Sequence, residues 1–357
     1  MDAGSSHLAR LGAASRPAGS RAASEARTYC ADVLRGLGFS IAERSFEYSK
    51  FTGAFAAPLA GLCIAAFAIA IFVMRPLSAT TLSALGVIAG AVALFFRYIG
   101  GRGVLGLPLS RAHGVNLEAT RGGSEPTVWL VAHIDSKWQP VSMITRVAGV
   151  ILSVIGLLGL IATSISARPS MNSVAAMFFV VAVLGSGPLL LSFVGARNHG
   201  TLDNASGVAT VLAAAELLAA EASVGVLITD AEELALAGAR AWAVTRRSGL
   251  ALNCDSVDDD GELVVMYSAP TPDRLLSAFS SVARETGEAL RVLRLIPGIL
   301  TDHVALASAG WTTLTLSRGT ARTLRRIHTS RDTLATMHGA GIAGAARVLA
   351  RTAAELS

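Results

Sequence analysis

The chain has 357 residues, of which 52% are hydrophobic and only 15% are charged, and its formal net charge is +5. Soluble domains carry about 25% charged residues, so this composition argues against an ordinary cytosolic enzyme. It also argues against disorder, which requires low hydrophobicity. The basic residues are scattered and aromatic residues make up 6% of the chain, so we expect no nucleic acid partner. Basic residues beside a lipid bilayer explain the charge more simply.

The N-terminal residues 1–24 are rich in Ala, Ser, Gly and Arg and lack an apolar core segment. They therefore do not resemble a secretory signal peptide. We expect a flexible leader here, with a mitochondrial-type presequence as the alternative. The cysteines Cys30, Cys63 and Cys254 are odd in number and widely spaced, which predicts no disulfide framework and fits a reducing compartment.

Four long windows without a charged residue predict membrane-spanning helices. They are Thr52–Met74, Leu77–Phe96, Val147–Ala167 and Pro169–Ala196. Each has the ~20 residues needed to cross ~30 Å of hydrocarbon. Short basic turns at Arg75-Pro76 and Arg168-Pro169 join the windows in pairs, so we expect two transmembrane hairpins, 52–96 and 147–196. Buried helices of a soluble protein are the alternative.

Two hairpins would leave the rest of the chain on one side of the bilayer. Most of the basic residues near the predicted spans lie on that side: Arg44, Lys50, Arg97, Arg102, Lys137, Arg146 and Arg197. Only Arg75 and Arg168 lie on the other. By the positive-inside rule, this bias predicts a multi-pass membrane protein with four spans and a cytoplasmic polar part.

The residues outside the hairpins, 25–51, 97–146 and 197–357, are enough for one catalytic domain. Apolar segments predict strands at 40–48, 114–120, 127–132, 224–229, 263–267 and 312–316. Helices are predicted at 25–37, 207–220, 233–246, 273–286 and 331–354. This alternation predicts an α/β fold, a three-layer sandwich with a largely parallel central sheet, interrupted by the two transmembrane hairpins.

Polar residues gather where the predicted strands end, which is where parallel sheets place their sites. They are His133, Asp135, Asp203, Glu232, Glu233, Asp255 and His328. Imidazole and carboxylate groups together suit divalent metals, with zinc favoured. Each feature alone has a simpler explanation: Asp203 could cap a helix, Glu232 and Glu233 could complement a helix dipole, and a single histidine could be an ordinary polar residue.

Taken together, the motifs resemble those of the zinc-dependent aminopeptidases, the co-catalytic dizinc metallopeptidases of clan MH. That family includes leucyl aminopeptidase, glutamate carboxypeptidase-like and glutaminyl cyclase-like members. The matching segments, in the family's order, are AHIDS (132–136), DNASGV (203–208), AEE (231–233), NCD (253–255) and HTSRDT (328–333). The resemblance covers essentially the whole chain outside the hairpins, which would make the protein a membrane-embedded variant.

The resemblance implies two Zn²⁺ per chain, with Asp203 bridging both ions. The implied ligands are His133, Asp203, Glu233, Asp255 and His328. Glu232 would act as the general base, taking a proton from a metal-activated bridging water and delivering it to the leaving amine. Asp135 would accept the other ring N–H of His133. The implied function is hydrolysis of peptide bonds by a membrane-anchored aminopeptidase.

Asp302 and His303 resemble a Ser-Asp-His element of the family, with Thr301 in place of Ser. We expect them either in the substrate pocket or at a helix cap. The acidic run 258–260 before Gly261 reads as a solvated turn.

The chain departs from the family between Asp135 and Asp203, where a hairpin replaces a short loop. Only a few residues lead from the predicted membrane to Asp203, and an extended chain spans ~3.3 Å per residue. We therefore expect the site to lie near the bilayer. We also expect the substrates to be membrane-proximal peptides. Two other functions stay open: a one-zinc glutaminyl cyclase-like acyltransferase, and a non-catalytic membrane scaffold that kept the fold.

Overall fold

A computed structural model describes residues 3–122, 125–165, 169–295 and 299–357. The chain folds into two units: Met1–Tyr48, Arg111–Trp138 and Gly195–Ser357 form the first, and Ser49–Ser110 and Gln139–Val194 form the second. These boundaries differ from the expected ones, because 97–110 belongs to the second, helical unit and the N-terminal segment belongs to the first.

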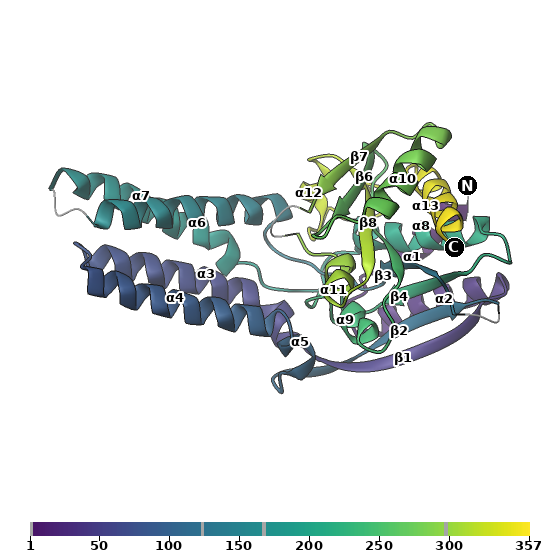
Figure 1. Cartoon of the computed structure of the whole chain (residues 1–357), viewed down its shortest axis with the longest axis horizontal. Coiled ribbons are helices and arrows are strands. Elements are labelled where there is room, and N and C mark those ends of the chain that lie inside the picture. Colours follow the sequence, from purple (N-terminus) through teal and green to yellow (C-terminus); the bar gives the residue numbers. More distant parts are fainter. Residues whose placement is uncertain (1–2, 123–124, 166–168, 296–298) are drawn as a thin grey trace. The chain divides into compact units, whose positions relative to one another are not determined.

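The described part of the first unit is built on one eight-stranded sheet (Figure 1). Its strands are β1 (Ser40–Ser49), β2 (Arg111–Thr120), β3 (Val128–His133), β4 (Val224–Thr229), β5 (Leu250–Val257), β6 (Glu262–Tyr267), β7 (Leu290–Arg294) and β8 (Thr312–Gly319). Their order is β1-β2-β4-β3-β5-β8-β6-β7. The central strands β4, β3, β5 and β8 are mutually parallel, whereas β2 and β6 pair antiparallel with β4 and β8.

Helices cover both faces of this sheet. One face carries α8 (Ser206–Leu217), α10 (Asp273–Thr286) and α13 (Ile342–Leu356), and α1 (Ala3–Leu11) and α2 (Arg21–Gly36) pack against α8. The other carries α9 (Ala237–Ala243) and α11 (Asp302–Ser308). On this face the ring of Trp242 packs edge-to-face with Trp129 and at a tilt against Trp311. Because both faces are covered, every residue of β3 and β4 is buried. The predicted three-layer α/β fold with a largely parallel sheet is confirmed.

Two predicted helices are shorter than expected. The helix expected over 233–246 begins only at Ala237, because Ala231, Ala235 and Leu236 have positive φ angles and hold the preceding residues in turns. The helix expected over 331–354 begins at Ile342. In place of its first part, turns follow the short helix α12 (Thr323–Arg326).

The N-terminal segment is folded, in contrast to the flexible leader expected over 1–24. Residues Ala3–Leu11 form α1, whose Leu8 and Leu11 are buried, and α2 begins at Arg21 with Ser20 as its N-cap. Such a short apolar stripe is a weak sequence signal, because a helix of this length is stable only through tertiary packing. Here α8 provides that packing.

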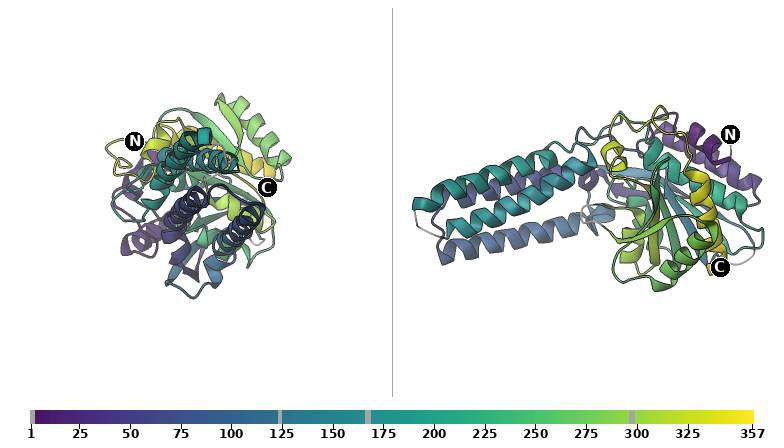
Figure 2. Two further views of the ribbon diagram at one scale, coloured as in Figure 1. Left: turned by 90° about the vertical axis from the view of Figure 1, so that its left-hand side faces the viewer. Right: turned by 90° about the horizontal axis from the view of Figure 1, so that it is seen from above.

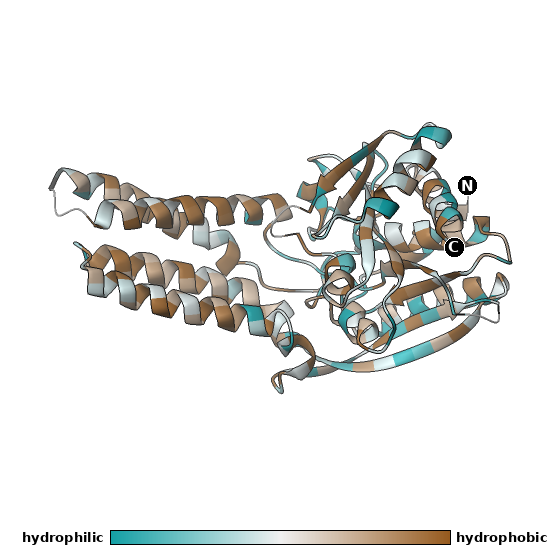
Figure 3. Cartoon of the chain, viewed as in Figure 1, coloured by the Kyte–Doolittle hydropathy of each residue, from teal (hydrophilic) through white to brown (hydrophobic). Residues whose placement is uncertain are grey.

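The second unit contains α3 (Lys50–Val73), α4 (Ala79–Ile99), α6 (Met143–Ser164) and α7 (Asn172–Leu190), together with the short α5 (Gly103–Gly106) (Figure 2). In the described part of the chain, these four long helices are the ones long and apolar enough to cross a membrane, and Figure 3 shows their apolar character. They match the four predicted windows. Arg168, in the second predicted turn, lies outside the described residues.

Small residues allow three of these helices to pack closely. A side chain added at Gly156 of α6 would collide with the backbone of Ala182 on α7, and one added at Gly61 of α3 would collide with the backbone of α7 at Ser186. Close approach through small residues is the usual way that helices associate in membranes. By contrast, α4 makes little contact with α3, and an added side chain at its Gly90 would meet nothing.

The closely packed Gly156 and the open Gly90 allow a variant and its control to be compared. We expect Gly156→Ala to force α6 and α7 apart and to lower the free energy of unfolding by about 1–3 kcal/mol, the usual cost of overpacking. Gly90→Ala should leave stability unchanged or slightly higher, since alanine is the better helix former. Unfolding of the detergent-solubilised protein by a denaturing detergent measures both, and equal stability of the two variants would contradict the packing seen between α6 and α7.

Candidate metal centre

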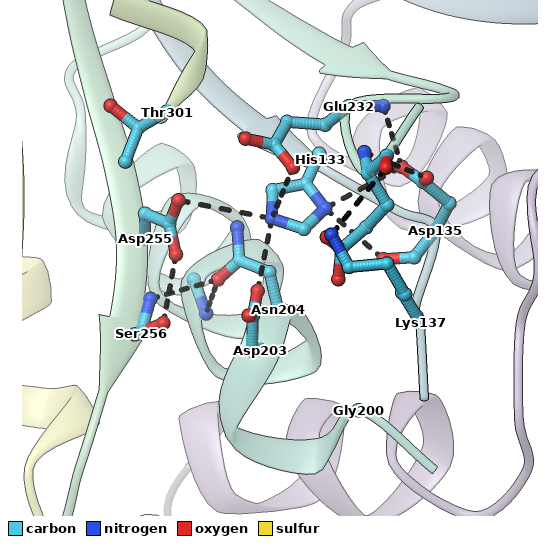
Figure 4. Close-up of polar contacts among 12 residues, drawn as sticks. His133, Asp135, Lys137, Gly200, Asp203, Asn204, Glu232, Asp255, Ser256 and Thr301 are labelled. Atoms are coloured by element: carbon cyan, nitrogen blue, oxygen red, sulfur yellow. Dashed lines mark hydrogen bonds and ion pairs between the residues drawn. The ribbon is translucent and has the colours of Figure 1, made fainter. Parts of the chain in front are cut away.

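The first part of the centre is the turn that follows β3. His133 is the last residue of β3 and is 1% exposed, and its Nδ1 lies 3.1 Å from the backbone oxygen of Asp135 and 3.5 Å from the Asp135 carboxylate. That carboxylate accepts the backbone N–H groups of Glu232 and Glu233, at 3.0 and 3.2 Å. The hydrogen-bond partner of His133 Nδ1 is thus the backbone oxygen of Asp135, whereas the Asp135 carboxylate holds the turn that carries the two glutamates (Figure 4).

Asp203 lies in the turn Thr201–Ala205 that precedes α8. One of its carboxylate oxygens is 3.2 Å from Nε2 of His133 and the other is 3.0 Å from Nε2 of His328. Burial alone would raise the pKa of Asp203, but the two histidines lower it well below its usual value. The backbone N–H groups of Leu202 and Asp203 are fixed by the carboxylate of Asp332. Asp203 thus faces two histidines at once, as a bridging ligand must.

Glu232 and Glu233 follow β4, yet their side chains have different surroundings. Glu233 contacts Nζ of Lys137 through one oxygen, at 2.6 Å, and Nε2 of His328 through the other, at 3.0 Å. Despite burial, His328 and Lys137 lower the pKa of Glu233 to about 2. The Glu232 carboxylate lies 3.8 Å from Nε2 of His133. Burial raises the pKa of Glu232 well above its usual value, with Glu233 among the carboxylates that add to the shift and His133 opposing it.

Asp255, at the end of β5, completes the group around His133. Its Oδ2 lies 3.8 Å from Nε2 of His133, and its Oδ1 accepts a hydrogen bond from Ser256 at 2.8 Å. Burial and the neighbouring Asp203 raise the pKa of Asp255 to about 7. All five residues predicted as metal ligands are therefore brought together.

The described residues contain two groups that could each hold a cation. His133, Glu232 and Asp255 form one, and Asp203, Glu233 and His328 form the other; within each group the ligand atoms lie within 4.8 Å of one another and every residue is buried. In the described structure, Nε2 of His133 and Oε1 of Glu233 are buried and make no hydrogen bond of good geometry, although Asp203 and His328 lie 3.2 and 3.0 Å from them. Buried polar atoms that are not fully hydrogen-bonded are costly, and imidazole and carboxylate are zinc ligands. The residues present therefore fit a zinc centre.

The electrostatics agree with this fit. Although burial opposes it, the carboxylates around His133, with Glu232 foremost, raise the pKa of its imidazole well above the usual value. A buried histidine becomes easier to protonate only where the surrounding potential is strongly negative. A divalent cation would be favoured at that position for the same reason.

Asp302 and His303 are fully buried at the start of α11. The carboxylate of Asp302 accepts a hydrogen bond from Thr229, and Nδ1 of His303 lies 2.7 Å from the hydroxyl groups of Thr301 and Thr315. Thr301 precedes α11 but makes no side-chain cap. The contacts of this pair are with the strands β4 and β8, and whether it also contacts substrate stays a prediction.

Two features of the centre were missed from the sequence. Lys137 pairs with the predicted metal ligand Glu233. The sequence feature that could have indicated this is the position of Lys137, two residues after Asp135. The acidic run 258–260 is also more than a solvated turn: Asp258 is buried against Thr323 and Arg326, and Asp259 accepts the backbone N–H groups of residues 338–340. These bonds fix segments on both sides of His328, the one before it through Asp258 and the one after it through Asp259.

Comparison with known proteins identifies the family. The model of peptidase family M28 matches residues 116–353, which is more than half of the chain. The chain belongs to peptidase family M28. A comparison with curated proteins found no match.

Solved structures agree at the level of the fold. The aminopeptidase from Aneurinibacillus sp. strain AM-1 has a TM-score of 0.58 at 12% identity, with 98% of this chain and 93% of that chain covered. A zinc aminopeptidase from Bacillus subtilis has a TM-score of 0.58 at 13% identity, covering 99% and 94%. The glutaminyl cyclase of Fimbriiglobus ruber has a TM-score of 0.55 at 13% identity, covering 100% and 95%. The family and these similarities support zinc and a peptidase-type fold.

Asp135 provides a test of how the centre is held. In Asp135→Asn, an amide N–H₂ would face one of the two backbone N–H groups that the carboxylate now accepts, so the glutamate turn should shift. We expect zinc affinity to fall about 10- to 100-fold, the usual effect of losing a partner that supports metal ligands. Competition with a chromophoric chelator measures this affinity. Asp273→Asn, at the exposed start of α10, is the matched control, and equal zinc affinity in both variants would show that Asp135 does not support the centre.

Proposed function

We propose that this member of peptidase family M28 is a membrane-anchored aminopeptidase that holds two zinc ions. The observation that carries the proposal is the arrangement around Asp203, whose two carboxylate oxygens face His133 on one side and His328 on the other. Asp255 would complete the first ligand set and Glu233 the second. Two such sets that share one carboxylate are typical of co-catalytic metal pairs.

When bound, the metals would supply Lewis acidity toward a water molecule and the scissile carbonyl. The chain itself supplies the proton transfer. Among the described residues, Glu233 pairs with Lys137 and His328 at 2.6 and 3.0 Å, whereas the Glu232 carboxylate makes a longer contact with His133, at 3.8 Å. A buried carboxylate whose pKa is raised can both accept and release a proton near neutral pH. We therefore assign Glu232 as the general base, which takes the proton of the attacking water and returns it to the leaving amine.

The choice of an aminopeptidase rests on similarity, because the solved structures that the chain resembles include aminopeptidases.

Membrane attachment is part of the proposal and rests on α3, α4, α6 and α7, which are long and apolar enough to span a bilayer. The bias of basic residues supports a cytoplasmic catalytic unit. Because the chain passes from the end of the helical unit at Val194 to Asp203 within a few residues, we propose membrane-proximal peptides as the substrates.

Glu232→Gln tests the assigned base. Glutamine keeps the size of the side chain but cannot accept the proton, so we expect peptide hydrolysis to fall by about 10²- to 10⁴-fold while bound zinc is retained. Turnover of an aminoacyl reporter and metal content measure the two effects. Glu262→Gln, on the exposed side of β6 where Glu262 pairs with Arg291, should behave as the wild type. Near-normal turnover in Glu232→Gln would remove the assigned base.

A substrate panel distinguishes this function from its alternatives. We expect the purified chain to contain about two zinc ions and to release N-terminal residues from aminoacyl reporters, with Glu232→Gln as the blank. Cyclisation of peptides with N-terminal glutamine, together with about one zinc ion, would favour a glutaminyl cyclase-like acyltransferase, whose fold the chain also resembles. A chain without zinc and without either activity would be a scaffold.

A further inference from the structure

Arg16, in the connection between α1 and α2, is a fully buried cation that lies outside every motif identified above. Its side chain is 1% exposed. The guanidinium donates hydrogen bonds to five backbone carbonyl oxygens, which belong to Leu11, Ala14, Ile134, His199 and Gly200. An arginine that was covered by chance would not find so many hydrogen-bond partners. The surrounding backbone is therefore arranged to bind the guanidinium.

These carbonyl groups come from three segments of the chain. Leu11 and Ala14 belong to the N-terminal segment itself. Ile134 lies between His133 and Asp135, at 2.9 Å from Nε of Arg16. The oxygens of His199 and Gly200, at 2.8 and 2.9 Å, lie just before the turn that carries Asp203. One planar group thus joins the two turns that carry His133 and the bridging carboxylate.

The backbone of Arg16 adds to this connection. Its N–H donates to Oγ of Ser136 at 2.9 Å, and the N–H of Ser136 donates to the carbonyl oxygen of Arg16 at 2.9 Å. On the other turn, the hydroxyl of Thr201 donates to the carbonyl oxygen of Gly12. The N-terminal segment is therefore attached on both sides of the metal centre.

The charge of Arg16 also matters to the centre. The guanidinium makes no hydrogen bond to a carboxylate among the described residues. Burial lowers the pKa of Arg16 to about 10, and Asp332, Asp135 and Asp203 oppose this shift through space. Asp332 holds the N–H groups of the Asp203 turn, and Asp135 holds those of the glutamate turn. Arg16 thus offsets the repulsion among carboxylates that position the ligands.

We propose that Arg16 is a positioning residue of the metal centre, which sets the separation between the His133 turn and the Asp203 turn. The N-terminal segment 3–20 is then a working part of the site. Only an arginine meets this geometry, because a lysine carries the charge without the planar fork that reaches carbonyl groups in several directions. The inference rests on the proposed zinc centre, since its consequence is tighter metal binding.

The test compares zinc affinity with stability in the full-length, detergent-solubilised chain. Arg16→Lys keeps the charge and Arg16→Met removes it, and both variants lose the planar guanidinium. We therefore expect both to bind zinc about 10- to 100-fold more weakly. Competition with a chromophoric chelator measures this affinity. Arg27→Met is the matched control: Arg27, in the neighbouring helix α2, is also buried, but it pairs with Glu43 and Ser24. That variant should lower the unfolding temperature of the metal-free protein without weakening zinc binding.

Each outcome bears on the proposal. Unchanged zinc affinity in both Arg16 variants would overturn it, and so would an equal loss of affinity in Arg27→Met, which would mean that Arg16 acts only through general stability. If the Arg16 variants do not fold, Ser136→Ala decides: weaker zinc binding supports the proposal and wild-type affinity overturns it. Failure of the wild type to bind zinc would instead refute the proposed function.

Discussion

The repulsion among buried carboxylates is the constraint that shapes this protein. Those at the strand ends and in the adjoining turns include Asp135, Asp203, Asp230, Glu232, Glu233, Asp255, Asp258, Asp302 and Asp332. In a medium of low polarity, such a concentration of charge is unstable unless cations or N–H groups offset it. The chain supplies some of this compensation itself, through Lys137 against Glu233, Arg16 behind the turns and backbone N–H groups on Asp135 and Asp332. The negative charge that remains without compensation is greatest between His133 and His328. Two divalent ions bound there would offset it.

The sequence predicted the parts of this centre that depend on local pattern. Short apolar segments indicated the strands, and parallel strands bring their carboxyl ends to one edge. Residues as far apart along the chain as His133 and His328 were placed in one site by the resemblance of five motifs to the zinc-dependent aminopeptidases. The sequence could not show which hydrogen-bond partners a polar side chain has when several are within reach. Asp135 was expected to serve His133 alone, but its carboxylate holds the backbone of Glu232 and Glu233.

The N-terminal segment shows where pattern reasoning fails. Its composition resembles that of a disordered leader, and a single arginine among several others carries no signal. Order arises from tertiary contacts: Leu8 and Leu11 pack against α8, and Arg16 finds its carbonyl partners in turns more than a hundred residues away. The late start of the helix predicted over 233–246 has a similar origin, since positive φ angles at Ala235 and Leu236 arise from the turn that presents the glutamates.

The placement of the helical hairpins explains how a ligand set can survive two long insertions. Each insertion is closed by backbone hydrogen bonds at its two ends. Lys50 donates to Ser110 at the first, and Trp138 and Gly195 exchange a reciprocal pair at the second. Gly195 must be a glycine, because an added side chain would meet the ring of Trp138 at 2.8 Å, and the guanidinium of Arg197 lies 5.1 Å from the centre of the same ring. With its ends fixed in this way, the second insertion behaves as a loop of almost zero span. Because the entropy cost of closing a loop grows only slowly with its length, the long insertion between Asp135 and Asp203 adds little to the cost of bringing them together.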